Sequence, residues 1–344
     1  MRRLVILPPH NLWSAWTDPP DSSEPDREEM FRLLFARGYS YRRIDPFGLP
    51  WNPFAKAHPL LCAIDPIRAL RILLFHRHTD IVLCFYESAA LLILLLRRMF
   101  LFGGKVVVYD VGVGGSWRLR DFILRLVVPR ADMLLPLGHN QVAGLLAMGA
   151  RPGTIQPVLD AISTEYFHEV EDQPDGYILA VGDDISRDYA TLLKASVGLS
   201  REVIIRTHEV FEDKGAVSNV TVMRSRLVTR DYRELIAGAV FVVLPLHPST
   251  HAGGITTLLE AMSSGKAVIV TASPGLADYL QDGKTCRVVR PCDPDALRRA
   301  IDDLLADALA RRRLGADARR FVVENCSAAS DAARFASVLD RLLI

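Results

Sequence analysis

Short apolar runs alternate with helical segments along almost the whole chain, and this alternation limits the possible folds most strongly. Apolar runs bounded by turn residues predict buried strands, and the segments between them are long enough for helices. Strands linked in this way form parallel sheets covered by helices on both faces. The first set of predicted strands is Leu4–Leu7, Tyr41–Ile44, Ile81–Phe85, Val106–Tyr109 and Met133–Leu135, and the helices between them are Asp26–Arg37, Ala89–Phe100, Leu119–Val128 and Asn140–Met148.

The alternation pauses at Glu169–Gly176, an acidic stretch with proline and glycine that is typical of a linker. With 344 residues the chain is long enough for two domains. We predict an N-terminal domain over 1–172, a C-terminal domain over 173–327 and a closing helix over 328–344. The second set of predicted strands is Tyr177–Val181, Val203–Arg206, Val220–Met223, Phe241–Leu244, Ala267–Thr271 and Cys286–Val289, and its helices are Tyr189–Val197, Tyr232–Ala237, Thr256–Met262, Gly275–Leu280 and Pro294–Ala306.

One stretch, residues 249–275 (STHAGGITTLLEAMSSGKAVIVTASPG), carries the strongest functional signal. Its Gly-Gly pair opens an apolar helical run, and glycines at a helix start let a ligand approach the backbone. The free N–H groups at such a start favour an anion such as phosphate. Glu260 lies about one and a half turns further along, where a carboxylate accepts hydrogen bonds from sugar hydroxyls. This pattern predicts a nucleotide-diphosphate site.

Other signals exclude several classes of protein. The five cysteines are odd in number and far apart without a C-x-x-C pair, which argues against a disulfide framework or structural zinc and for a reducing cytoplasm. The opening MRRLVILPPH predicts a first buried strand and not a signal peptide. The chain shows no Ser-His-Asp set, Walker loop, G-x-G-x-x-G fingerprint or nucleic-acid-binding motif.

The first half contains a basic and apolar region. Residues 37–130 hold 14 Lys and Arg against 6 Asp and Glu, and they include the run ALLILLLRRMFLF at 90–102. An apolar surface beside basic side chains is attracted to an anionic membrane. The alternative is a buried helix whose arginines cap one end. A transmembrane span is not expected, because the uncharged run Ser88–Leu96 is too short and Arg97 and Arg98 end it.

Four segments of the second half together resemble a known family. They are YILAVGDDISRDYATLLKA (177–195), NVTVMRSRLVTRDYRELIAGAVFVVLPL (219–246), GGITTLLEAMSSGKAVIVT (253–271) and DGKTCRVVRPCDPDALRRAI (282–301). Their order and spacing are similar to those of retaining GT-B glycosyltransferases, nearest to glycosyltransferase family 4, the glycosyl transferases group 1 type. The resemblance covers about residues 175–325, and more weakly 130–150 and 157–167. It implies an α/β fold of two doubly wound, Rossmann-like domains facing across a cleft, the first binding the acceptor and the second the nucleotide sugar.

The resemblance also implies roles for individual residues. Glu260 stands where the family's glutamate holds the donor ribose. The alternative interpretation is that Glu260 is a solvent-facing residue of its helix. Arg187 and Arg206 are the basic side chains nearest to the diphosphate, and the alternative for Arg187 is an exposed residue at a helix start. Neither a metal nor a cofactor is expected. The backbone positions that the resemblance assigns to the donor are Gly182, Gly253, Gly254, Ile255 and Thr256.

The chain departs from the family pattern at several positions. Ala252 stands where the family has a first glutamate, so His251 beside it is a candidate catalytic residue. Asp183 and Asp184 follow Gly182, where the family often has an arginine, and they bring negative charge towards the phosphate site.

In the first domain, the loop after the first strand contains no glycine. His10 or the backbone of this loop is therefore predicted on the acceptor side. Asp110, which follows the strand 106–109, is the first-domain candidate for a sugar or acceptor contact. Its alternative is an ordinary turn residue at a strand end.

The leading hypothesis is a retaining, metal-independent glycosyltransferase that uses a nucleotide-diphosphate sugar. Its expected acceptor is a lipid-linked or envelope or exopolysaccharide glycan, and the enzyme is expected in the cytoplasm, peripheral on the anionic inner face of the membrane. No nucleic-acid partner is expected. The alternatives are a catalytically inactive nucleotide-sugar-binding protein, suggested by Ala252 and the Asp183-Asp184 pair, and a nucleotide-sugar epimerase that needs no acceptor.

Overall fold

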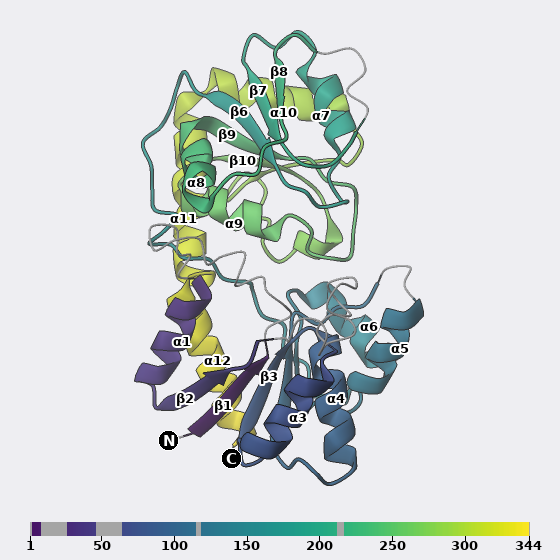
Figure 1. Cartoon of the computed structure of the whole chain (residues 1–344). Coiled ribbons are helices and arrows are strands. Elements are labelled where there is room, and N and C mark those ends of the chain that lie inside the picture. Colours follow the sequence, from purple (N-terminus) through teal and green to yellow (C-terminus); the bar gives the residue numbers. More distant parts are fainter. Residues whose placement is uncertain (1, 8–25, 46–63, 115–117, 212–216, 344) are drawn as a thin grey trace. The chain divides into compact units, whose positions relative to one another are not determined.

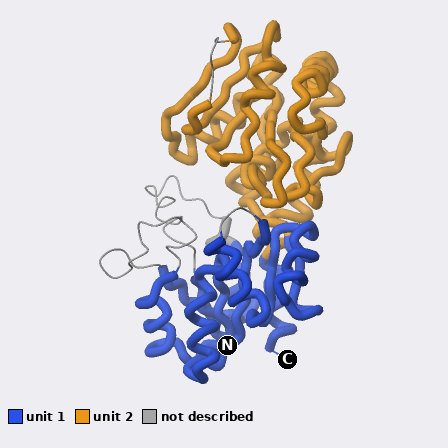
Figure 2. The backbone as a smooth tube through the Cα atoms, turned by 90° about the vertical axis from the view of Figure 1, so that its right-hand side faces the viewer, with its two compact units in different colours: residues 1–23, 28–158, 332–344 blue, residues 24–27, 159–331 orange. Residues whose placement is uncertain are grey.

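The computed structural model describes residues 2–7, 26–45, 64–114, 118–211 and 217–343. Contacts divide the chain into two compact units (Figure 2). Unit 1 comprises residues 1–23, 28–158 and 332–344, and unit 2 comprises 24–27 and 159–331. Residues 159–172, which the sequence analysis placed in the first domain, are grouped with unit 2.

Unit 1 contains a sheet of five parallel strands in the order β2-β1-β3-β4-β5 (Figure 1). All five strands were predicted from the sequence. Helices follow the strands, as expected for βαβ units. The strands are β1 (Arg2–Leu7), β2 (Tyr39–Arg43), β3 (Ile81–Phe85), β4 (Lys105–Tyr109) and β5 (Met133–Leu135), and the helices are α1 (Asp26–Ala36), α3 (Pro66–Phe75), α4 (Glu87–Arg98), α5 (Arg118–Val127), the 3₁₀ turn η2 (His139–Gln141) and α6 (Val142–Ala147).

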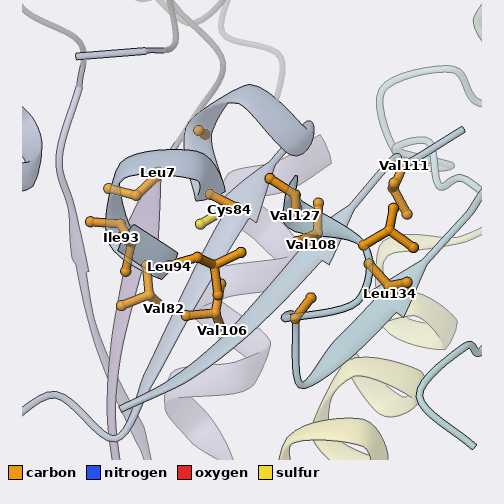
Figure 3. Packing of buried hydrophobic residues seen from close by; sticks show 14 of the residues in the cluster. Leu7, Val82, Cys84, Ile93, Leu94, Val106, Val108, Val111, Val127 and Leu134 are labelled. Carbon is orange, nitrogen blue, oxygen red and sulfur yellow. The ribbon is translucent and has the colours of Figure 1, made fainter. Parts of the chain in front are cut away.

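Both faces of this sheet are buried, because successive side chains of a strand point to opposite faces. Val106 and Val108 of β4 belong to one apolar cluster, and Val107 and Tyr109 belong to the other. Figure 3 shows the first cluster, in which the β-strand valines pack with Ile93 and Leu94 of α4 and with Val127 of α5. The continuous apolar strand sequences therefore reflect a sheet that is covered on both sides.

Unit 2 contains six parallel strands in the order β11-β10-β9-β6-β7-β8. The chain moves outward from β6 through β7 to β8 and then resumes at β9 on the other side of β6. This reversal is a topological switch point, where ligands bind beyond the carboxyl ends of the strands. The strands are β6 (Tyr177–Val181), β7 (Val203–Arg206), β8 (Val220–Met223), β9 (Ala239–Leu244), β10 (Val268–Thr271) and β11 (Arg287–Val289).

The helices of unit 2 only partly follow the prediction. Its helices are α7 (Tyr189–Ser196), α8 (Thr229–Gly238), α9 (Ile255–Ser263), η3 (Pro274–Leu276), α10 (Pro294–Ala306), α11 (Ala308–Asn325) and the start of α12 (Ala328–Leu342). The predicted helix Gly275–Leu280 is wrong, because only the 3₁₀ turn η3 forms there. Helix α11 was not predicted, and neither was α3 in unit 1. Helix α11 packs against α9, and a side chain at Gly315 would overlap the carbonyl oxygen of Gly265.

Helix α12 contributes to both units. Its first residues, up to Asp331, belong to unit 2, and its remainder belongs to unit 1. In unit 1, Phe335 and Leu339 are fully buried in the cluster that also contains Leu4 and Ile6 of β1. Across the described ranges, no helix combines the length and apolar character that crossing a membrane requires.

Candidate functional site

The loops after β6 and β9 lie at the switch point of the second sheet (Figure 1). Backbone hydrogen bonds join the two loops. The amide of Asp188 donates to the carbonyl of Pro245 at 2.9 Å, and the amide of His247 donates to the carbonyl of Ser186 at 2.7 Å. Arg187 forms an isolated antiparallel bridge with Leu246. Within the first loop, the carboxylate of Asp184 accepts from the amide of Ser186 at 2.7 Å. These bonds fix the backbone that carries Arg187.

The Arg187 side chain is buried, with 6% of its surface exposed, so the alternative of an exposed residue at a helix start is wrong. Its Nη2 donates to Thr257 Oγ1 at 3.3 Å. Its Nε and Nη1 are buried without a hydrogen-bond partner in the described part of the chain. A buried cation with unmet donors is costly unless an anion pairs with it. The site is therefore suited to an anionic ligand.

Two glycines make room for this guanidinium. A Cβ at Gly182 would overlap Arg187 Nε, and a Cβ at Gly254 would lie 2.5 Å from Nη1. Both glycines have positive φ, +142° and +80°, which side-chain-bearing residues rarely adopt. The sequence analysis placed both at the donor site, and the structure brings both against the guanidinium of Arg187.

Helix α9 begins beside this arginine. Its N-cap is Gly254, and among the described residues no side chain caps its N-terminal amides. Unbonded amides and the helix dipole attract anions at this end. The hydroxyl of Ser186 is also buried without a partner in the described ranges, and a side chain at Gly253 would overlap it. The helix starts at Ile255, one residue before the predicted start at Thr256.

Glu260 is on the same helix, with 5% of its surface exposed, so its alternative as a solvent-facing residue is wrong. Its Oε2 accepts a hydrogen bond from the hydroxyl of Tyr232 at 2.5 Å. Burial, together with the charge of Glu260, raises the pKa of Tyr232 well above its ordinary value of 10. The tyrosine therefore stays protonated and holds the carboxylate in place. Sequence reasoning did not identify Tyr232, Ser186 or Thr257.

Arg206 ends β7 and is paired with Asp183. Its Nη1 lies 2.8 Å from Asp183 Oδ2, and the amide and imidazole of His208 bind the same carboxylate. Partial burial raises the pKa of Asp183, but the His208 hydrogen bonds and the Arg206 charge outweigh it and leave this pKa below 3.8. The charge of Asp183 is thus balanced by Arg206, and His208 is hydrogen-bonded to the same carboxylate.

His251 lies in the exposed loop that leads into Gly253. Its amide donates to Ser249 Oγ at 3.0 Å, and the hydroxyl of Ser273 donates to the carbonyl of Ser249 at 3.1 Å. A Cβ at Gly275 would overlap the carbonyl of His251. The loop is therefore held against the turn after β10, and it places His251 at the carboxyl edge of the sheet beside the α9 N-terminus.

The two candidates from the first half of the chain are Asp110 and His10. Asp110 directly follows β4 in unit 1 and has a φ of 54°, a left-handed conformation that Asp tolerates better than most residues. Its amide donates to the carbonyl of Leu135 at 3.0 Å. His10 lies outside the described residues. The catalytic and acceptor roles of both residues stay predictions.

Residues 217–321 match the protein family described as glycosyl transferases group 1. The matched residues all lie within unit 2. The match lies within the range 175–325 that the resemblance covered, and it includes α9 and Glu260. The sequence-based recognition of this family type is therefore confirmed.

Curated relatives match part of the chain over part of their own length. The MMP α-(1→4)-mannosyltransferase of Mycolicibacterium hassiacum is 30% identical over 128 residues, which are 37% of this chain and 30% of that protein. A GDP-mannose-dependent α-(1-6)-phosphatidylinositol monomannoside mannosyltransferase of Mycolicibacterium smegmatis is 36% identical over 81 residues, 24% of this chain and 21% of the relative. The chain thus spans less than a third of these relatives' lengths.

Solved structures match the chain from end to end. Sucrose-phosphate synthase from Thermosynechococcus elongatus has a TM-score of 0.76 at 16% identity, covering 99% of both chains. Anabaena HepE in complex with UDP-glucose has a TM-score of 0.68 at 12% identity, covering 99% of this chain and 100% of that one. At these identities the likeness concerns the fold. The predicted GT-B fold of two Rossmann-like α/β domains is confirmed.

Proposed function

We propose that the chain is a glycosyltransferase that moves a sugar from a nucleotide-diphosphate sugar to an acceptor. The observation that carries this proposal is the buried guanidinium of Arg187, which has two unmet donors beside the uncapped α9 N-terminus. The match of residues 217–321 to the glycosyl transferases group 1 family supports the same function. Anabaena HepE has been solved with UDP and with UDP-glucose, which supports a nucleotide-diphosphate donor here.

The proposed chemistry follows from charge. As the bond to the sugar breaks, negative charge grows on the departing diphosphate, and preorganised donors stabilise it. Arg187 supplies Nε and Nη1, Ser186 supplies a hydroxyl, and α9 supplies backbone amides. Glu260, held by Tyr232, accepts from the ribose hydroxyls. This arrangement supplies the stabilising charge from the protein alone, so the proposed mechanism contains no metal or cofactor.

Retention of anomeric configuration is part of the proposal. In the proposed step the acceptor hydroxyl forms its bond to the anomeric carbon on the face that the diphosphate leaves. The departing phosphate oxygen takes the hydroxyl proton, so no pair of carboxylates at glycosidase spacing is required. His251 and Asp110 are proposed sugar or acceptor contacts, and His10 is proposed on the acceptor side.

We further propose a lipid-linked or envelope glycan as acceptor, bound while the enzyme sits peripherally on the cytoplasmic face of an anionic membrane. In unit 1, α4 packs against both α3 and α5. Phe75 at the end of α3 is 74% exposed, and Phe100 after α4 is 97% exposed. Basic side chains lie on the same helices, among them Arg97 and Arg98 of α4. Two relatives are named for a phosphatidylinositol mannoside and for lipopolysaccharide core, which supports a lipid acceptor.

A nucleotide screen tests the donor site. UDP, GDP, ADP and their common sugars should be added to the wild-type protein and to Glu260→Ala, with melting temperature as the readout. Binding raises the melting temperature by mass action. We expect one nucleotide series to raise it, and we expect the shift to vanish in Glu260→Ala and to shrink in the isosteric Glu260→Gln. If no nucleotide shifts the wild type, the donor site is refuted.

A turnover assay separates transfer from the alternatives. The nucleotide sugar found by the screen is incubated with membrane lipid extract, and free nucleotide and lipid-linked sugar are both measured. Sugar appearing in the lipid fraction supports the proposal. Binding without release of nucleotide supports the inactive binder, which Ala252 favours. A free epimer formed without any acceptor supports the epimerase.

A vesicle assay tests the membrane part alone. We expect the protein to sediment with phosphatidylglycerol vesicles at low salt, less with phosphatidylcholine vesicles, and less in the double variant Phe75→Ser, Phe100→Ser. Because both side chains are exposed, the variant should keep the wild-type melting temperature. The absence of vesicle binding by the wild type would overturn the membrane proposal and leave the donor site untouched.

A further inference from the structure

Three side chains that can bind a metal ion converge beside the group 1 site. Asp188 is the N-cap of α7, His247 follows β9, and Cys292 precedes α10. His247 Nδ1 lies 3.8 Å from Asp188 Oδ2 and 4.0 Å from Cys292 Sγ. All three ligand atoms lie within 4.8 Å of one another. None of these residues has a role in the proposed sugar transfer.

The distances approach those of a tetrahedral metal site. Zn–N, Zn–O and Zn–S bonds of about 2.0–2.3 Å place tetrahedral ligand atoms roughly 3.3–3.8 Å apart. The two separations from His247 Nδ1, 3.8 and 4.0 Å, must shorten by about 0.5 Å, and the separation between Asp188 and Cys292, which is within 4.8 Å, must shorten by about 1 Å at most. A nucleophilic triad does not fit, because both the thiol and the carboxylate approach the same ring nitrogen, Nδ1, and the imidazole cannot relay a proton between them.

The ligands stand on fixed backbone. Asp188 is buried, and its two oxygens accept from the amide and the hydroxyl of Thr191 at 3.0 and 2.6 Å. Second hydrogen bonds of this kind orient a metal ligand. Backbone bonds from Asp188 to Pro245 and from His247 to Ser186 hold the first two ligands together. Cys292 and His247 are exposed, which leaves an entry path for the ion.

We propose that Asp188, His247 and Cys292 bind one divalent ion of the zinc class. A thiolate and an imidazole select zinc over magnesium or calcium, which prefer oxygen ligands. The thiol proton passes to the solvent on binding, and the thiolate and carboxylate together neutralise the ion's charge. The fourth position is open to water. The ion joins three loops, including the one that carries Arg187, and the inference stands independently of the proposed sugar transfer.

A cobalt titration of the untagged protein tests the site. Co²⁺ bound to a thiolate gives a sulfur-to-cobalt absorption in the near ultraviolet. We expect this absorption to saturate at one equivalent in the wild type and to vanish in Cys292→Ser and in His247→Ala. The matched control is Cys62→Ser, a cysteine outside the described residues, which should keep the full signal. Absent absorption in the wild type, or absorption that survives Cys292→Ser, overturns the proposal.

Zinc competition and stability give a second readout. Zn²⁺ should displace Co²⁺ and raise the melting temperature of the wild type but not of Cys292→Ser. Because Thr191 Oγ1 orients Asp188, Thr191→Val should weaken metal affinity by about 10- to 100-fold. Mg²⁺ should not raise the melting temperature of the wild type. If Mg²⁺ raises the melting temperature as much as Zn²⁺ does, the assignment to the zinc class is refuted.

Discussion

Replacing Arg187 by methionine removes the two unmet donors while filling similar space. Each buried donor left without a partner costs about 1–3 kcal/mol, so Nε and Nη1 together cost roughly 2–6 kcal/mol in the ligand-free protein. The variant also loses the bond to Thr257, worth about 1 kcal/mol. We therefore expect Arg187→Met to raise the free energy of unfolding by about 1–5 kcal/mol. For a unit of this size the melting temperature should rise by about 2–20 °C.

The same variant should lose its diphosphate ligand. Two hydrogen bonds from a charged donor contribute about 1.5–3 kcal/mol each, or roughly 3–6 kcal/mol together. The dissociation constant for the preferred nucleoside diphosphate should rise by roughly two to four orders of magnitude. Calorimetric titration of UDP and GDP measures this loss, and urea unfolding without nucleotide measures the gain in stability. A gain in stability together with a loss of binding is the expected pair of results.

The matched control for this experiment is Arg230→Met. Arg230 is exposed, and its ion pair with Glu234 lies on the surface, so neither the stability nor the binding free energy should change by more than about 0.5 kcal/mol. Two results would refute the reasoning about Arg187. One is nucleotide binding by Arg187→Met at the wild-type affinity. The other is a loss of more than about 2 kcal/mol in stability, which would mean that the guanidinium is already satisfied by the protein.

Three further changes test neighbouring features. Gly254→Ala should abolish nucleotide binding, because the added Cβ would lie 2.5 Å from Nη1 of Arg187. The control is Gly283→Ala, which also has positive φ but has open space around it. This control should lose only about 1 kcal/mol of stability and should still bind nucleotide. Equal binding by both glycine variants would contradict the crowding argument. Tyr232→Phe removes the 2.5 Å hydrogen bond to Glu260. Nucleotide affinity measured by calorimetry should fall by about 10-fold. Unchanged affinity would show that Glu260 does not depend on this hydrogen bond for its position. Burial lowers the pKa of Lys266 from 10.5 to about 8, so the unfolded chain keeps this proton between pH 8 and 10.5 while the folded chain loses it. Urea unfolding should therefore show that the stability of the wild type rises across this pH window by up to about 3 kcal/mol relative to Lys266→Met. If the stability of the two proteins changes with pH in the same way, the lowered pKa of Lys266 is refuted.

The strands could be predicted because their signal is local. A run such as Val106–Val108 is apolar at every position, and both of its faces are buried. Helix α11 was missed for the opposite reason. It contains five arginines and Gly315, and its role depends on a close approach to the carbonyl of Gly265, which local sequence does not contain.

The candidate site shows the same limit. The Gly-Gly pair and Glu260 share one helix, so their spacing was informative. Tyr232 lies 28 residues from Glu260 in the sequence. The burial of Arg187 with two unmet donors depends on Gly254, a glycine more than sixty positions further along the chain. His247 and Cys292 are 45 residues apart in the sequence. The absence of a C-x-x-C pair therefore could not exclude a metal site built from Asp, His and Cys side chains of different loops.

The division of helix α12 between the two units affects how the protein is made. The ribosome releases β1 long before α12, but Leu4 and Ile6 of β1 pack in the same apolar cluster as Phe335 and Leu339 of α12. Unit 1 therefore lacks part of its core until all of unit 2 has been synthesised, and unit 2 is the first that can finish folding. During that interval the nascent first unit exposes the part of this apolar face that α12 covers, while Met30 and Leu34 of α1 belong to the same cluster and are already present. A chain truncated after residue 158 would expose that part permanently.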